Sequence, residues 1–170
     1  PPTATALQCA GNIPAAVTTI TAFNNLPGAS ASDNCTATNN LIVTSTTSGL
    51  NGNTYNGTIT RTYTVRDACN NPTTVNHVFN INDTTPPNAE CTDFAIDLDP
   101  DGTINIFVDD IDNGSNDNCS NVTLTLSQTT FDCTNVGPNI IMLTVTDSSG
   151  NIDICTATVT VTSPNINGGT

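Results

Sequence analysis

Threonine alternates with apolar residues over several stretches of the chain, and a period of two is typical of β-strands rather than helices. Every second residue is a threonine in 58–64 and again in 156–162. In 139–147 the alternation places Ile141 and Val145 on the same face. Such strands have one apolar and one polar face, as in a half-buried antiparallel sheet. No stretch shows the helical period, so we predict an all-β protein.

The sequence contains two diverged copies of one module. A Pro-Pro pair precedes a cysteine at Pro1-Pro2 and again at Pro86-Pro87, and further echoes follow in the same order in both halves. These echoes are Asp33-Asn34-Cys35 with Asp117-Asn118-Cys119, and 64–71 with 144–151. Several short strands with frequent turn signals are typical of immunoglobulin-like sandwiches. We therefore predict two tandem immunoglobulin-like β-sandwich modules, at 1–84 and 85–170.

A turn between two predicted strands begins at Asp147, and Asp67 begins the corresponding segment of the first module. We expect both aspartates to cap these hairpin turns rather than bind metal. His77 lies in a threonine-rich strand and is expected on the exposed face of the sheet. Arg61 and Arg66 are expected at the surface or at an interface, without a catalytic role.

The seven cysteines include no Cys-x-x-Cys pair, so disulfides are favoured over a zinc site. Disulfides persist in oxidising compartments, which predicts an extracellular or cell-surface location. The sequence contains no signal peptide and no transmembrane run, and a chain that starts at Pro1 is expected to be a mature product or an excised piece. A net charge of −13 argues against binding to nucleic acid and against insertion into an anionic membrane.

The acidic residues are concentrated in the second half of the chain. Residues 1–82 hold Asp33 and Asp67 against two arginines, so 13 of the 15 acidic residues (15 − 2) lie in 83–170, which holds no Lys or Arg. Two carboxylates about 5 Å apart repel by roughly 3 kcal/mol at an effective dielectric constant near 20. Either these side chains extend into water or a cation lies among them. Ca²⁺ is the cation that clustered carboxylate and carbonyl oxygens favour.

Two segments supply candidate Ca²⁺ ligands. The first comprises Asp109, Asp110, Asp112, Asn113 and Asp117. The second comprises Asp97, Asp99 and Asp101, at the D-x-D-x-D-G spacing that opens an EF-hand loop. The EF-hand pattern then fails, because its twelfth position is Val108 rather than glutamate. The alternative is that both segments form solvated acidic turns in which Asp and Asn side chains cap the backbone.

Short motifs recur in one order through both modules. In the second module they are Asp117-Asn118-Cys119, Phe131-Asp132-Cys133 with Val136-Gly137, and Thr144–Asn151 followed by Cys155. In the first module they are Asp33-Asn34-Cys35, 60–64 with Asp67-Ala68-Cys69, and the exit segment 82–87. Together they resemble the hyalin-repeat and polycystic-kidney-disease-like sandwich modules. Such modules occur in large secreted and surface proteins, including the gliding-motility adhesins of gliding bacteria.

The resemblance implies three disulfides, Cys91–Cys155, Cys119–Cys133 and Cys35–Cys69. In the first module, Val75 stands where a cysteine of the final strand would fall, which leaves Cys9 without an evident partner. The residues alone do not fix the connectivity, and seven cysteines leave at least one unpaired.

The repeat, the proline linker and the resemblance predict a non-catalytic structural or adhesive module of an extracellular repeat protein or surface fibre. The module would be stapled by disulfides and stabilised by Ca²⁺. Its partners would be neighbouring repeats, copies of the same protein, or surface glycans and proteins. A variant of this hypothesis makes the chain a subunit of an extracellular filament.

A second hypothesis is a carbohydrate-binding accessory module of a secreted enzyme. Sugar-binding surfaces use exposed aromatic side chains, for which Tyr55 and Phe107 are the candidates. Enzymatic activity is not expected. His77 is the only histidine in the sequence, and the chain offers no Ser/His/Asp or Cys/His set around it.

Overall fold

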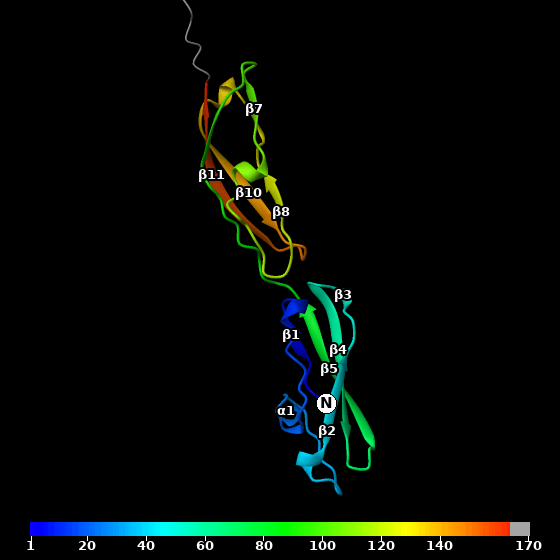
Figure 1. Cartoon of the computed structure of the whole chain (residues 1–170). Coiled ribbons are helices and arrows are strands. Elements are labelled where there is room, and N and C mark those ends of the chain that lie inside the picture. Colours follow the sequence, from blue (N-terminus) through cyan, green and yellow to red (C-terminus); the bar gives the residue numbers. More distant parts are fainter. Residues whose placement is uncertain (164–170) are drawn as a thin grey trace, which may run out of the picture. The chain divides into compact units, whose positions relative to one another are not determined.

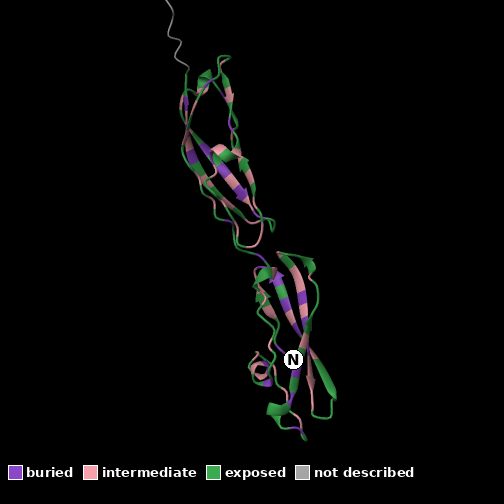
Figure 2. Cartoon of the chain, viewed as in Figure 1, coloured by how far each residue is buried: buried purple, intermediate pink, exposed green. Residues whose placement is uncertain are grey.

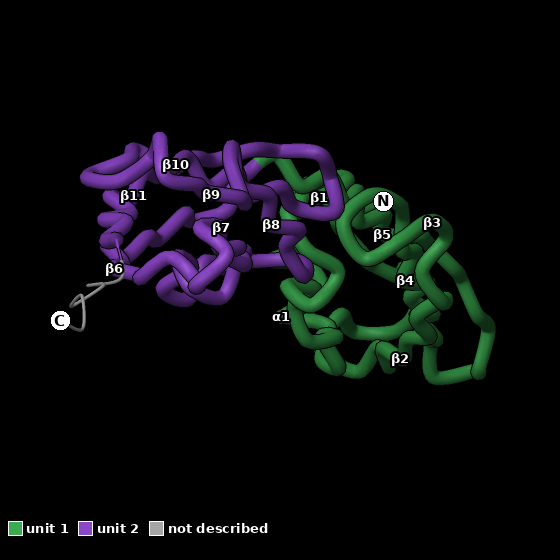
Figure 3. The backbone as a smooth tube through the Cα atoms, turned by 90° about the horizontal axis from the view of Figure 1, so that it is seen from above, with its two compact units in different colours: residues 1–84 green, residues 85–170 purple. Residues whose placement is uncertain are grey.

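The computed structural model describes residues 1–163 and divides the chain into two compact units. The first unit is Pro1–Thr84 and the second begins at Thr85 (Figure 3). Strands dominate both units, which confirms the prediction of an all-β protein. Within the described residues, the one α-helix is α1 (Ile20–Asn24), and the other helical elements are short 3-10 turns.

The first unit contains one five-stranded sheet (Figure 1). Its strands are β1 (Thr5–Leu7), β2 (Ile42–Thr47), β3 (Asn51–Asn53), β4 (Asn56–Arg66) and β5 (Pro72–Asn82). They are ordered β1-β5-β4-β2, and β3 pairs with β4 beyond the end of β2. β1 runs parallel to β5, whereas the other pairs are antiparallel.

The second unit contains a four-stranded sheet and a separate two-stranded one. The larger sheet is formed by β6 (Phe94–Asp97), β8 (Thr123–Leu126), β10 (Gly137–Thr146) and β11 (Ile152–Thr162), in the order β6-β11-β10-β8. β7 (Thr103–Asn105) and β9 (Thr130–Asp132) form the smaller sheet. β6 runs parallel to β11, and the remaining pairs are antiparallel.

The two units share one plan. In each, two long strands form a hairpin, the first strand lies parallel to the last, and an earlier strand (β2 or β8) pairs antiparallel with the first strand of the hairpin. The hairpin registers also coincide. Arg66 pairs with Pro72 and Thr146 pairs with Ile152, so residues 67–71 of the first unit correspond to 147–151 of the second.

The alternation seen in the sequence is the alternation of buried and exposed residues along the strands (Figure 2). In β10, Ile141, Leu143 and Val145 are buried, whereas Ile140 and Met142 face solvent. The core of the second unit is one continuous cluster, formed by Leu98, Ile106, Ile111, Phe131, Ile141, Leu143, Val145, Ala157, Val159 and Val161. The period-two pattern therefore predicted which face of this sheet is apolar.

The core of the first unit is divided into two clusters. One cluster comprises Ile20, Phe23, Leu41, Val43 and Tyr63, and the other comprises Ile59, Phe79 and Ile81. Phe23 of α1 contacts Tyr63 edge to face, with ring centroids 5.3 Å apart. This helix was missed by the sequence analysis because a single turn is too short to show a period of 3.6. Thr19 caps it by accepting a hydrogen bond from the backbone N–H of Ala22.

Arg61 and His77 lie on the inner face of the sheet, and both are buried, which corrects their expected surface positions. They are cross-strand partners in β4 and β5. The Arg61 guanidinium lies 5.2 Å from the ring centroid of Phe79, and its Nε donates to Thr47 Oγ1. By register, their counterparts in the second unit are Ile141 and Ala157. For Arg61 the neighbouring threonines of β4 occupy the opposite face, and for His77 the threonines of β5 precede the buried part of the strand, so neither set of neighbours indicated burial.

Candidate functional site

The turn between β10 and β11 is closed by Asp147 and Asn151. The backbone N–H of Asp147 donates to the carbonyl of Asn151 at 3.0 Å. In return, the backbone N–H and the side-chain amide of Asn151 donate to the two carboxylate oxygens of Asp147, each at 2.8 Å. Gly150 adopts a left-handed backbone conformation, with φ of 90°, which allows the tight return of the chain.

The turn between β4 and β5 has the same construction. Asp67 accepts from the backbone N–H of Asn71 at 2.8 Å and from its side-chain amide at 2.6 Å. Asn70 takes the left-handed position, with φ of 66°, which asparagine tolerates better than most residues. The prediction that Asp67 and Asp147 cap hairpin turns is confirmed.

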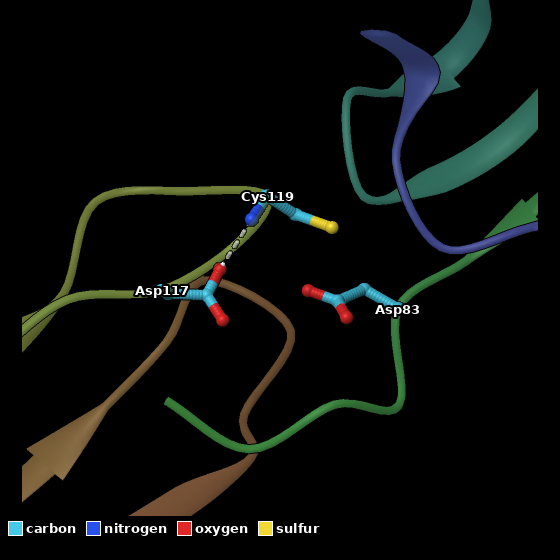
Figure 4. Close-up of side chains that lie close together, drawn as sticks. All are labelled: Asp83, Asp117 and Cys119. Atoms are coloured by element: carbon cyan, nitrogen blue, oxygen red, sulfur yellow. Dashed lines mark hydrogen bonds between the residues drawn. The ribbon is translucent and has the colours of Figure 1, made fainter. Parts of the chain in front are cut away.

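A second aspartate caps a neighbouring turn in each unit. Asp117 accepts through Oδ2 from the backbone N–H of Cys119 (Figure 4). The same oxygen accepts from the backbone N–H of Ser120. Asp33 accepts in the same way from Cys35 and Thr36. This local geometry is an Asx turn, and it gives the repeated Asp-Asn-Cys motif a structural role.

The two turns of each unit are joined by a hydroxyl group. Thr36 Oγ1 accepts a hydrogen bond from the backbone N–H of Ala68, which follows Asp67. Ser120 Oγ accepts in the same way from Ser148, which follows Asp147. We name this arrangement the Asp-capped corner: the two aspartates, the Asn that closes the hairpin and the bridging hydroxyl. Sequence analysis missed Thr36 and Ser120, although a hydroxyl residue follows Asp-Asn-Cys in both modules.

Hydrogen bonding to the charged form lowers the pKa of three aspartates, Asp33, Asp67 and Asp147. Burial alone raises the pKa of Asp147, but hydrogen bonds from the Asn151 side chain and from backbone N–H groups outweigh it and hold the pKa below its ordinary value. Asn71 lowers the pKa of Asp67, first through its side chain and then through its backbone. The backbone N–H groups of Cys35 and Thr36 lower the pKa of Asp33. The carboxylates are therefore charged at neutral pH.

The predicted Ca²⁺ ligands serve mainly as local caps. Asp110 accepts from the backbone N–H of Phe107 at 2.8 Å, and Asp112 accepts from Ser115 at 3.0 Å. In the other segment, Asp101 accepts from the backbone and the hydroxyl of Thr103, and Asp97 accepts from the hydroxyl of Thr162. Asp99, Asp109 and Asn113 are exposed.

These ligands do not form one site. Among residues 1–163, no three of the predicted aspartates bring carboxylate oxygens within 4.8 Å of one another. The backbone N–H groups already use Asp110, Asp112 and Asp117 as acceptors, which fits the alternative of acidic turns. Ca²⁺ binding therefore stays a prediction from charge, and no functional step is derived from it.

A disulfide joins Cys91, just before β6, to Cys155 in β11, with a Cα–Cα distance of 5.8 Å. This is the bridge that the resemblance implies between the first and last strands of the second unit. Val75 is the register counterpart of Cys155, so the first unit has no equivalent bridge at this place.

The other two expected disulfides are corrected by the structure, because the thiols of Cys35, Cys69 and Cys133 are free and exposed. Cys119 is disulfide-bonded, but not to Cys133. These two cysteines lie near opposite ends of β10, a ten-residue strand. At about 3.3 Å per residue such a strand is far too long for a direct bridge.

The loops of Cys35 and Cys69 are adjacent, yet the contact between them is made by Thr36 and Ala68. Both cysteines are exposed, and neither is in a disulfide. Cys9, which lacked an evident partner in the sequence, is disulfide-bonded. The connectivity thus departs from the resemblance at every cysteine except Cys91 and Cys155.

His77 packs against Phe79 and contacts Thr5 in the interior of the first unit. Its Nε2 lies 2.9 Å from Thr5 Oγ1, its ring lies 4.3 Å from that of Phe79, and Nδ1 has no hydrogen-bond partner among the described residues. Burial and the nearby Arg61 charge lower the pKa of His77. The imidazole is therefore neutral at physiological pH and only 5% exposed.

Comparison of the sequence with protein-family models and with curated proteins finds no match. None of the helices in the described part of the chain has the length and hydropathy needed to cross a membrane. The disulfides indicate an oxidising, non-cytosolic environment.

Proposed function

We propose that the chain is a non-catalytic structural module of an extracellular repeat protein, built from two tandem immunoglobulin-like units. The observation that carries the proposal is the internal repeat. Both units have the same strand plan, the same five-residue hairpin turn and the same Asp-capped corner. Two units that share their strands, and also the polar contacts that hold their turns, are typical of proteins in which many similar modules follow one another.

The strand order supports the immunoglobulin-like assignment of the second unit. β8, β10 and β11 follow one another as the C, F and G strands of such a sandwich, and the β7–β9 pair supplies part of an opposite sheet. In the first unit, α1 and the loops around it stand where an opposite sheet would lie. The first unit is thus a more diverged version of the same plan.

The polar residues that could perform catalysis are engaged in structure. The single histidine is buried beside Phe79, and the corner aspartates accept backbone hydrogen bonds. Their structural contacts support the non-catalytic part of the proposal. We include neighbouring repeats or copies of the protein among the partners, since repeat modules adjoin others of their kind.

Labelling of intact cells that produce the protein tests this function. An antibody raised against residues 1–163 should label unpermeabilised cells or their extracellular fibres in electron microscopy. Protease treatment of intact cells should remove the label. Labelling that appears only after permeabilisation would contradict the proposal.

A second candidate function, carbohydrate binding, is favoured by one observation. Phe107 is 69% exposed, as a sugar-stacking aromatic would be, whereas Tyr55 is half-buried. Affinity electrophoresis in gels containing soluble polysaccharides should then show retardation that Phe107→Ala abolishes. Exposed Ile140 provides a matched control, because Ile140→Ala removes a similar apolar area without an aromatic ring.

A further inference from the structure

The sheet of the first unit has an open edge at β2 (Ile42–Thr47). This strand is the last of its sheet, and within the described chain it pairs with β4 alone (Figure 1). In an antiparallel pair, alternate residues direct their backbone N–H and C=O groups toward the partner, and the residues between them direct these groups away. In an edge strand, the groups directed away can pair with a further strand.

One hydrogen bond shows which residues of β2 face outward. The backbone N–H of Ser48 donates to the carbonyl of Thr60 at 2.8 Å, in register with the β2–β4 pairs. Every second residue before Ser48 therefore also directs its backbone groups at β4, whereas Val43, Ser45 and Thr47 direct theirs away. Within residues 1–163, no hydrogen bond outside the strand ladders uses the backbone of these three residues. The edge thus presents three N–H and three C=O groups to a partner strand.

β2 lacks the features that usually keep edge strands from pairing, which are charged side chains, proline and very short length. Its sequence, Ile-Val-Thr-Ser-Thr-Thr, contains no charged residue and no proline. With six residues it is the longest of the described strands that end a sheet. Ile42 is also 57% exposed, so the strand carries an apolar side chain that a neighbouring strand would cover.

The corresponding strand of the second unit is β8, since Ser127 follows it as Ser48 follows β2. Each serine hydroxyl accepts a hydrogen bond of 3.0 Å from the first hairpin strand, from the backbone N–H of Thr60 or of Met142. β8 has only four residues, and the 3-10 turn η3 (Val108–Asp110), which holds two aspartates, lies beside it. The helix beside β2 is α1, which contains no charged residue. Of these two corresponding edges, the one in the first unit is therefore the less protected.

The charge distribution favours a second copy of the chain as the partner at this edge. The first unit contains two arginines and three aspartates, so its net charge is −1 (2 − 3). The second unit contains the other 12 acidic residues (15 − 3) and no Lys or Arg. Two copies therefore repel each other least through their first units. An uncharged edge also provides no attraction for an acidic or a basic peptide.

We propose that two copies of the chain pair antiparallel through β2, with Ser45 of each copy on the two-fold axis. Val43 would then lie opposite Thr47 of the partner copy, and each Ser45 opposite the other. These pairs would exchange two backbone hydrogen bonds each and join the two sheets into one. The proposal rests on the proposed function, since it names a contact by which copies of a surface repeat protein associate.

The side chains of β2 also match those of a second β2. On the outer face of the sheet, Thr44 of each copy would lie opposite Thr46 of the other. β2 already pairs with β4 in this manner, since Thr44 lies opposite Thr64 and Thr46 opposite Thr62. Cross-strand threonine pairs stabilise a sheet, so the second copy would add further pairs of a kind that the sheet already contains.

Hydrogen exchange of the ¹⁵N-labelled chain, measured at low and at high protein concentration, tests the proposal. Exchange of the Val43, Ser45 and Thr47 amides should slow at the concentration at which sedimentation shows dimers. The Thr44 and Thr46 amides are the internal control, because they donate to β4 in both states. All samples carry three substitutions that stop exposed thiols from cross-linking the copies, Cys35→Ser, Cys69→Ser and Cys133→Ser.

Charge variants at Ser45 locate the two-fold axis. Ser45→Lys and Ser45→Glu each place like charges directly opposite in the dimer, and each should weaken it about fivefold. An equimolar mixture pairs opposite charges and should form mixed dimers roughly twentyfold tighter than those of either variant alone. A misfolded variant could not produce this gain. Asn80→Lys and Asn80→Glu are matched controls that should leave association unchanged, since Asn80 is exposed on β5, an inner strand of the same sheet.

A chain that sediments as a monomer at millimolar concentration would overturn the proposal. Dimers that leave exchange at Val43, Ser45 and Thr47 unchanged would also overturn it, since another surface would then hold the copies together. The same conclusion would follow from a mixture of the Ser45 variants that associates no better than each variant alone. None of these results affects labelling at the cell surface, so failure of the β2 pairing and failure of the proposed function are distinguishable.

Discussion

Asp147 and Asn151 hold the β10–β11 turn through three mutual hydrogen bonds, at 3.0, 2.8 and 2.8 Å. The aspartate is only 6% exposed, so its carboxylate replaces water as the acceptor for these donors. Its counterpart Asp67 makes the equivalent contacts in a more exposed turn. Comparison of Asp147 with Asp67 therefore shows how much burial adds to the free energy that the same set of hydrogen bonds contributes to folding.

Replacement of Asp147 by alanine should lower the free energy of unfolding by about 3 kcal/mol, because several buried N–H groups lose a charged acceptor. Urea denaturation followed by circular dichroism measures this loss. Asp67→Ala is the matched control and should cost less. An equal cost at the two positions would show that burial of Asp147 contributes nothing.

The neutral, buried state of His77 should make the first unit sensitive to mild acid. Its pKa is lowered in the folded protein by burial and by Arg61, so the unfolded chain binds the proton more readily. The corresponding stability is present above about pH 6.5 and declines as the pH falls below that value. Melting temperatures measured between pH 8 and pH 5 should show this decline.

His77→Gln keeps a polar side chain at the site and should flatten the pH profile over the same interval. The side chains that face His77 are those of Arg61, Thr5 and Phe79, and the backbone of Thr3 also lies beside it. The pKa values of Asp33, Asp67 and Asp147 are lowered from the ordinary aspartate value, so these carboxylates affect a more acidic part of the curve. An unaltered slope in His77→Gln would rule out this histidine as the cause.

The Cys91–Cys155 bridge should contribute about 4 kcal/mol to the second unit in the chain-entropy model, given the 64-residue separation. The double variant Cys91→Ala/Cys155→Val removes it, and valine already occupies the equivalent position, Val75. Denaturation with and without a reducing agent provides the measurement. Reduction should destabilise the second unit of the wild type more than that of the variant, because the bond of Cys119 is reduced in both and only the wild type also loses Cys91–Cys155.

Thr5 pairs with Phe79 as Phe94 pairs with Val159, so the register makes Pro2, rather than a residue of the Pro86-Pro87 pair, equivalent to Cys91. The first unit should therefore accept the same bridge at Pro2 and Val75, the counterparts of Cys91 and Cys155. The double variant Pro2→Cys/Val75→Cys should oxidise spontaneously and gain about 3 kcal/mol. Mass spectrometry after digestion identifies the new bond, and each single variant serves as a control. Two cysteines that remain reduced in air would show that the backbones of the units differ at this place.

Calcium titration tests the prediction made from charge. At a concentration ten times the dissociation constant, bound Ca²⁺ would stabilise the second unit by about 1.4 kcal/mol, and a chelator would reverse the effect. Asp112→Asn should reduce the shift if the segment 109–117 holds the ion. A melting temperature that stays constant with Ca²⁺ and with chelator would leave these aspartates as turn caps alone.

Much of the fold could be predicted from local sequence. The alternation of apolar and polar residues along 139–147 and 156–162 predicted both the strands and the face that is buried. The hairpin-capping role of Asp67 and Asp147 was equally predictable, because an Asx turn depends only on nearby backbone. The burial of Arg61 and His77 was not, because it depends on which face of β4 and β5 meets the core.

The disulfides depend on long-range geometry and were predictable only where a strand pairing fixed them. Cys91 and Cys155 lie near the parallel β6–β11 pair, which the resemblance implied. Cys119 and Cys133 are close in sequence but separated by the length of β10 in space. The hydroxyl contacts of Thr36 and Ser120 join loops about 30 residues apart along the chain, so no local pattern could reveal them.

The position of the Cys91–Cys155 bond determines how the second unit responds to pulling. A force that draws its two ends apart enters before β6 and leaves after β11, and the sulfur–sulfur link connects these two places directly. The Cys91–Cys155 disulfide therefore carries the tension between the two ends of the unit. The 64-residue loop between the cysteines is excluded from extension, so even a unit that loses its strand pairing lengthens by only its short outer segments.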